Sequence, residues 1–137
     1  MMCTPDGAGC ALAAPSEAFA SVADALRVGR ALAGYLNSAA ADLAGPARGE
    51  ALEQLGAITS LLGAAANGLL RRFDADDGHD ADGYASSATW LAARNHLGRR
   101  DAKAAVRQMR LLARHPHLDA ATTTGALTIS WARDKAG

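Results

Sequence analysis

The chain is poor in aromatic residues and in cysteine. Phenylalanine, tryptophan and tyrosine make up 4% of its 137 residues, and there are two cysteines. Few large rings leave little apolar bulk. A single domain of this length is therefore expected to have a modest core, in which helices approach closely through small side chains. Cys3 and Cys10 fit neither a CxxC redox pair nor one half of a zinc site.

Targeting and membrane signals are also missing. Residues 1–15 contain no basic region followed by an apolar run, so no signal peptide is expected and this segment is predicted to be a flexible tail. The uncharged run over 55–70 is sixteen residues long. A membrane span needs about twenty apolar residues, so this run predicts a buried helix with close backbone approach at its glycines. No membrane partner is expected, and the expected location is the cytoplasm.

Motifs that carry catalysis or bind cofactors are absent. There is no nucleophile elbow, no glycine-rich phosphate loop and no HExxH pair. The stretch DADDGHDADG over 74–83 holds five aspartates and one histidine, but no register of a calcium-binding EF-hand loop places a glutamate at its twelfth position. No catalytic residue, metal or cofactor is expected, and 74–83 is predicted to be a solvated acidic linker.

What the sequence does contain is helical periodicity. Apolar residues recur at helical spacing after Ser16, a candidate N-cap, and again from Leu52 to Phe73. Gly45 and Pro46 separate the two patterns, and no alternating β-branched run is present. Residues 16–73 are therefore predicted to form a helical hairpin rich in glycine and alanine.

Residues 84–137 are predicted to form three short helices. Ser86 or Ser87 can cap the first, a turn around Gly98 leads to the second, and Thr128 can cap the last after a break at Gly125. The predicted fold class is all-α: a helical hairpin followed by a helix-turn-helix-like bundle of short helices.

A formal net charge of zero hides a strong asymmetry. Between Arg94 and Arg114 there are six arginines and one lysine against a single acid, Asp101. The helix predicted from Asp101 to Arg114 has an apolar face opposite a basic one. The apolar face consists of Ala102, Ala105, Val106, Met109, Leu112 and Ala113. The candidate nucleic-acid-binding residues are Arg99, Arg100, Lys103, Arg107, Arg110 and Arg114. The same stripe also fits an ordinary solvated helix face.

The pattern of residues 82–128 resembles a known family. Asp82-Gly83 before Tyr84, a serine ahead of Trp90-Leu91-Ala92, then Ala102, Arg107, Leu111-Leu112 and Gly125 with Leu127-Thr128 resemble the domain of unknown function 222 (DUF222). That domain is common in high-GC bacteria and typically precedes an HNH endonuclease domain. The resemblance implies a DNA-processing context. Here Gly98 stands where the family usually has the serine that caps the basic helix.

Two functional hypotheses of different class follow. The first is a DNA-associating, all-helical accessory domain that is normally attached to an HNH endonuclease and is C-terminally truncated here. Because no HNH segment follows before Gly137, this chain is not expected to be an enzyme itself. The alternative is a helical protein-interaction module without nucleic-acid binding, such as a homodimer formed through the Gly/Ala-rich hairpin.

Overall fold

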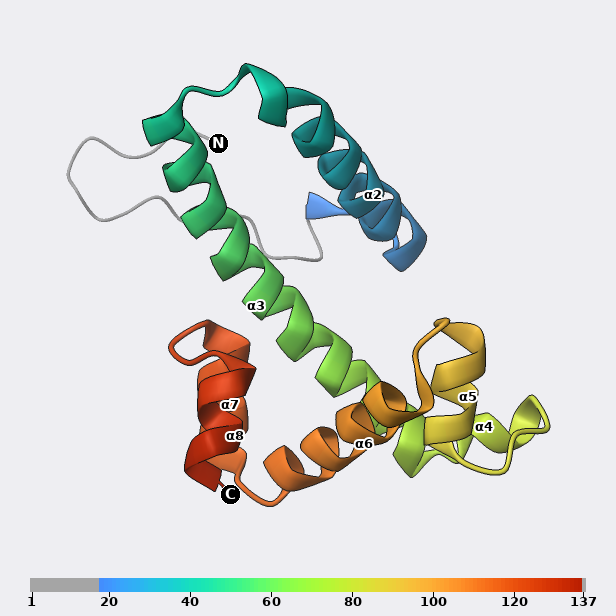
Figure 1. Cartoon of the computed structure of the whole chain (residues 1–137). Coiled ribbons are helices and arrows are strands. Elements are labelled where there is room, and N and C mark those ends of the chain that lie inside the picture. The colour runs from blue at the N-terminus through green and yellow to red at the C-terminus, as the bar shows by residue number, and fades with distance from the viewer. Residues whose placement is uncertain (1–17, 137) are drawn as a thin grey trace. The chain divides into compact units, whose positions relative to one another are not determined.

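The structure, a computed structural model, describes residues 18–136, and all regular secondary structure among them is helical (Figure 1). This confirms the all-α prediction. The predicted tail, both cysteines and Ser16 lie outside the described residues. The chain divides into two compact units, Met1–Gly49 and Glu50–Gly137.

The first unit is built around α2, Val22–Ala39, which is followed by the 3₁₀ turn η1, Ala40–Asp42. Its N-cap is Ser21, whose hydroxyl accepts a hydrogen bond from the backbone N–H of Asp24 at 3.0 Å. Asp24 also pairs with Arg27 one turn later. The helix places acidic charge at its positive end, as the helix dipole favours.

Helix α3, Gly45–Ala75, is 31 residues long and starts in the first unit. Pro46 occupies its first turn, where the missing proline N–H costs nothing because that group has no partner within the helix. Both helices of the predicted hairpin are present, and their packing into a hairpin stays a prediction. The prediction that 55–70 is a buried helix with close approach at its glycines is wrong for the described residues: only Ala64 and Asn67 of α3 are buried, and a Cβ at Gly56 or Gly68 would meet nothing within 4 Å.

The acidic stretch is more ordered than a solvated linker. Asp74 belongs to the last turn of α3, and α4, Gly78–Ala81, follows after Asp77, which has a left-handed backbone (φ 50°). A Cβ at Gly78 would stand within 2.4 Å of the Phe73 ring. The chain therefore turns a tight corner here, and glycine is needed because any side chain would collide with that ring.

The rest of the second unit consists of four short or medium helices, one more than predicted, because the segment between His115 and Gly125 is also helical. These are α5, Ser87–Arg94; α6, Arg99–Ala113; α7, Pro116–Thr124; and α8, Ile129–Ala136. The predicted caps are confirmed: Ser86 caps α5, Gly125 ends α7 at φ 83°, and the Thr128 hydroxyl accepts from the Trp131 backbone N–H at 3.1 Å. Each of these boundaries depends on a residue within a turn of the helix end.

Helix α6 lies at the centre of this unit, between α5 on one side and the α7–α8 pair on the other (Figure 1). Ala102, Val106, Met109 and Leu112 are buried on its inner face. Four members of the predicted apolar stripe are therefore in the core. Ala105 is half-buried, and Ala113 is exposed because it lies at the end of the helix.

Trp90 on α5 contacts both Phe73 near the end of α3 and Asp82 just after α4. Its ring lies 4.4 Å from that of Phe73, and its indole N–H donates to the Asp82 carboxylate at 2.7 Å. The Arg94 guanidinium lies 5.7 Å from the Trp90 ring centroid. The side chain is half-buried, so it acts as an anchor at the edge of the core.

The Trp90→Ala variant tests this anchor. Because Trp90 is only half-buried, we expect a loss of about 2–3 kcal/mol in the free energy of unfolding, below the 3–5 kcal/mol of a fully buried tryptophan. Trp131, 46% exposed on α8, is the matched control, and Trp131→Ala should cost less than about 1 kcal/mol. Urea unfolding of both variants measures the difference. Equal losses in the two would contradict the anchor role.

Candidate nucleic-acid interface

All six predicted basic residues are exposed, on and next to α6. They lie away from the buried face of this helix. Of these six, Arg110 has an acidic oxygen of a described residue within 4.0 Å, and the other five form no ion pair with any described residue. These five charges are therefore balanced by solvent ions and are open to a polyanion.

The turn that leads into α6 has a defined geometry. The backbone of His96 is left-handed, at φ 54°, and the Leu97 N–H bonds to the Ala92 carbonyl at 3.1 Å. This is the Schellman arrangement at a helix end, with histidine in the position that glycine usually takes. Gly98 is then the N-cap of α6, with no side-chain cap, so the helix starts at Arg99, two residues before the predicted start at Asp101. A tight turn followed by a basic amphipathic helix is the element order of a helix-turn-helix.

The basic residues divide between two hollows of the surface. Arg99 and Lys103 line one of them, together with Ser86, the N-cap of α5, and Thr89 in its first turn. The other is lined by Arg107, Arg110 and Arg114 of α6 and by Arg133 of α8. We call this second one the arginine groove. Arg100 lines neither hollow.

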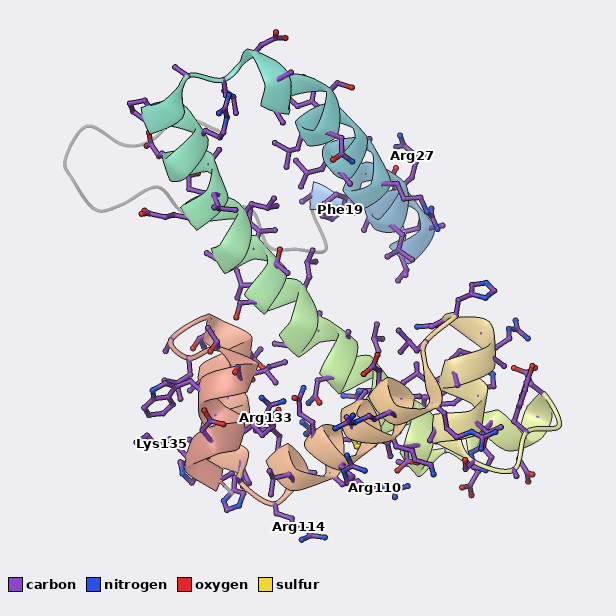
Figure 2. The ribbon with its side chains drawn as sticks, viewed as in Figure 1. Phe19, Arg27, Arg110, Arg114, Arg133 and Lys135 are labelled. Carbon is purple, nitrogen blue, oxygen red and sulfur yellow. The ribbon has the colours of Figure 1, made fainter. Side chains whose placement is uncertain are left out.

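Arg133 was missed by the sequence analysis. Arg133 lies on α8 (Figure 2). Its guanidinium donates a hydrogen bond to the Gln108 side chain of α6 at 3.4 Å, and both residues line the arginine groove. In the sequence it is followed by Asp134 and Lys135, a mixed run with no stripe. Only the packing of α8 on α6 reveals the fourth arginine.

Asp74 holds Arg110 in place. The Arg110 guanidinium donates to the Asp74 carboxylate at 3.1 Å, and the Ser87 hydroxyl donates to the same carboxylate at 2.7 Å. The Ser87 hydrogen bond and then the Arg110 guanidinium lower the pKa of Asp74 below its ordinary value of 3.8, against the opposing effect of burial. Asp74 thus positions one cation of the basic face, Arg110, and neutralises part of the positive charge of that face.

A metal site and a membrane span find no support in the described part of the chain. Residues 18–136 contain no group of three or more histidine, cysteine, aspartate or glutamate side chains placed to hold a metal ion. No helix there has the length and apolar character that crossing a membrane requires. Comparison of the sequence with protein-family models, with curated proteins and with solved structures finds no match.

The pairing of Asp74 predicts a pH dependence. Since the folded pKa is lowered, the stabilisation by this carboxylate is complete well above 3.8 and is lost as the pH falls through the folded pKa. Asp74→Asn should therefore be less stable than wild type at pH 7, and the gap should shrink from about pH 5 downward. Urea unfolding across this range measures it.

Asp76, an exposed acid two residues away, supplies the control. Asp76→Asn should show no such gap at any pH. A gap between wild type and Asp74→Asn that stays constant from pH 7 to pH 3 would show that the carboxylate charge is irrelevant at this corner.

Proposed function

We propose that the second unit is a DNA-associating helical domain that contacts the phosphate backbone of a duplex with the basic face of α6. The observation that carries this proposal is the set of five exposed cations on α6 and its C-cap that have no acidic partner among the described residues. A helix face used only for solubility usually mixes charges of both signs, whereas α6 contains a single acid, Asp101.

The geometry of α6 suits a groove of DNA. Its 15 residues give a length of about 22 Å at 1.5 Å per residue, and the major groove, about 12 Å wide, admits an α-helix. The basic residues recur every three or four positions, so they rise along one side of the helix. Such a row neutralises successive phosphates without reading bases, which gives weak, salt-dependent binding with little sequence preference.

The resemblance to DUF222 supports the same context. It implies a domain that accompanies an HNH nuclease, and it places no catalytic residue on any position of this chain. We therefore propose binding without cleavage, in the cytoplasm, where bacterial DNA lies.

The salt dependence of binding tests the proposal. In Lys103→Gln/Arg107→Gln, the slope of log K against log salt should become shallower by about two units, at about 0.9 per phosphate contact. Arg27→Gln/Arg30→Gln on α2 removes the same charge elsewhere and should leave the slope unchanged. Fluorescence anisotropy with a labelled duplex measures both. If wild type forms no complex at about 100 µM protein and low salt, beyond the usual range of non-specific affinity, the proposal fails.

Arg133→Gln tests the arginine groove separately. If Arg133 contacts a phosphate together with the α6 arginines, its loss should make the slope shallower by about one unit. Lys135→Gln on the same helix is the control, because the Lys135 ammonium lies 5.0 Å from the Trp131 ring centroid and does not line the groove. Equal effects of the two variants would assign the contribution of α8 to net charge alone.

A second candidate function, a protein-interaction module, is favoured by exposed apolar side chains on α2. Val22 is 75% exposed and Tyr35 72%, and Leu26 also faces solvent. Exposed apolar groups gathered on one element are typical of an interaction surface. Sedimentation velocity over a range of concentrations distinguishes the two functions: a reversible dimer without DNA affinity supports this one, and a monomer that binds DNA supports the first.

A further inference from the structure

Arg110, unlike the other five cations of the basic face, is paired with a carboxylate of a described residue. It lines the arginine groove, yet its Nη2 lies 3.1 Å from Asp74 Oδ1, and its Nε and Nη2 each lie 3.4 Å from Asp74 Oδ2. The side of the guanidinium that carries Nε and Nη2 therefore faces the carboxylate. A phosphate fits the same position, because its oxygens match such a pair of N–H groups as a carboxylate does.

Asp74 is the fixed member of this pair. Its carboxylate accepts a hydrogen bond from the Ser87 hydroxyl at 2.7 Å, and Ser87 is 1% exposed. The Asp74 side chain is 22% exposed and the Arg110 side chain 59%. Because Asp74 is anchored to a buried hydroxyl, Arg110 is the residue that can turn to another anion. An ion pair this open to water is weak, so a phosphate in the arginine groove can replace Asp74 as the partner of Arg110.

We propose that Asp74 competes with DNA phosphate for Arg110 and so weakens the DNA contact of α6, as an autoinhibitory contact within the chain. This inference rests on the proposed function. DNA binding gains free energy when phosphates and protein cations release their solvent counterions. Arg107 and Arg114 line the same groove without an ion pair to a described residue, so they are available to phosphate at once. Arg110 becomes a further contact only when the Asp74 charge is removed or displaced.

Asp74→Asn keeps the size of the side chain and removes its charge, so it should make Arg110 available to DNA. Fluorescence anisotropy of the full chain with a labelled duplex should show a slope of log K against log salt that is steeper by about 0.9, the value for one added phosphate contact. The gain in affinity over wild type should accordingly shrink roughly threefold between about 50 mM and about 200 mM salt. Asp76→Asn, at an exposed acid without an ion pair to a described residue, removes the same charge and should keep the wild-type slope.

A comparison of two arginines tests the competition without any change at Asp74. Arg107→Gln and Arg110→Gln each remove one cation that lines the arginine groove. Arg107→Gln should make the slope shallower by about 0.9, whereas Arg110→Gln should leave it near the wild-type value because Asp74 already holds that cation. The double variant Asp74→Asn/Arg110→Gln should also have the wild-type slope. Far-UV circular dichroism at the assay temperature checks that each variant is folded, and the two arginine variants decide alone if Asp74→Asn is not.

The outcomes separate this inference from the proposed function. If wild type forms no complex at about 100 µM protein and low salt, both fail. If wild type binds, equal slope changes in Arg107→Gln and Arg110→Gln overturn the inference and leave the proposed function standing. Equal slopes for Asp74→Asn and Asp76→Asn do the same, as does weaker DNA binding by folded Asp74→Asn. That last result would make Asp74 a positioning residue that holds Arg110 ready for phosphate.

Discussion

One face of α6 is the packing partner that α5, α7 and α8 share. Those three helices have 8, 9 and 8 residues, and isolated helices shorter than about 12–15 residues are marginal in water. Their stability therefore comes from contact with α6. Met109 and Leu112 are fully buried at this contact, and each contributes about 1.5–3 kcal/mol by leaving water. A net hydrogen bond to Asp74 contributes only about 1 kcal/mol, so apolar burial dominates the stability of this unit.

The same constraint gives α6 its second role. A helix that buries one face at the centre of a small unit must expose the other, and on α6 that face is almost entirely basic. Two residues from other helices then modify this face. The Asp74 carboxylate accepts a hydrogen bond from Arg110 at 3.1 Å, and Arg133 of α8 lines the arginine groove. Rigid burial on one side and unpaired charge on the other connect the fold to the proposed DNA contact.

Features that depend on neighbouring residues could be predicted from the sequence, and those that depend on distant ones could not. Ser86, Gly125 and Thr128 act within a turn of the helix ends they define, so the capping rules found them. The buried stripe of α6 follows from its period. In contrast, Ser87 and Arg110 approach Asp74 from 13 and 36 residues away, so composition alone made 74–83 look like a solvated linker. Arg133 likewise joins the arginine groove only when α8 packs on α6.

The most direct test of the account is a ¹H–¹⁵N NMR titration of the full chain with a short DNA duplex at low salt. The account predicts that the shifted backbone signals lie along the exposed side of α6, from Arg99 to Arg114, and around Arg133. The amides of α2 should stay unchanged. Shifts concentrated on α2, or no shifts at protein and DNA concentrations near 100 µM, where non-specific complexes normally form, would contradict the claim that α6 is the contact surface.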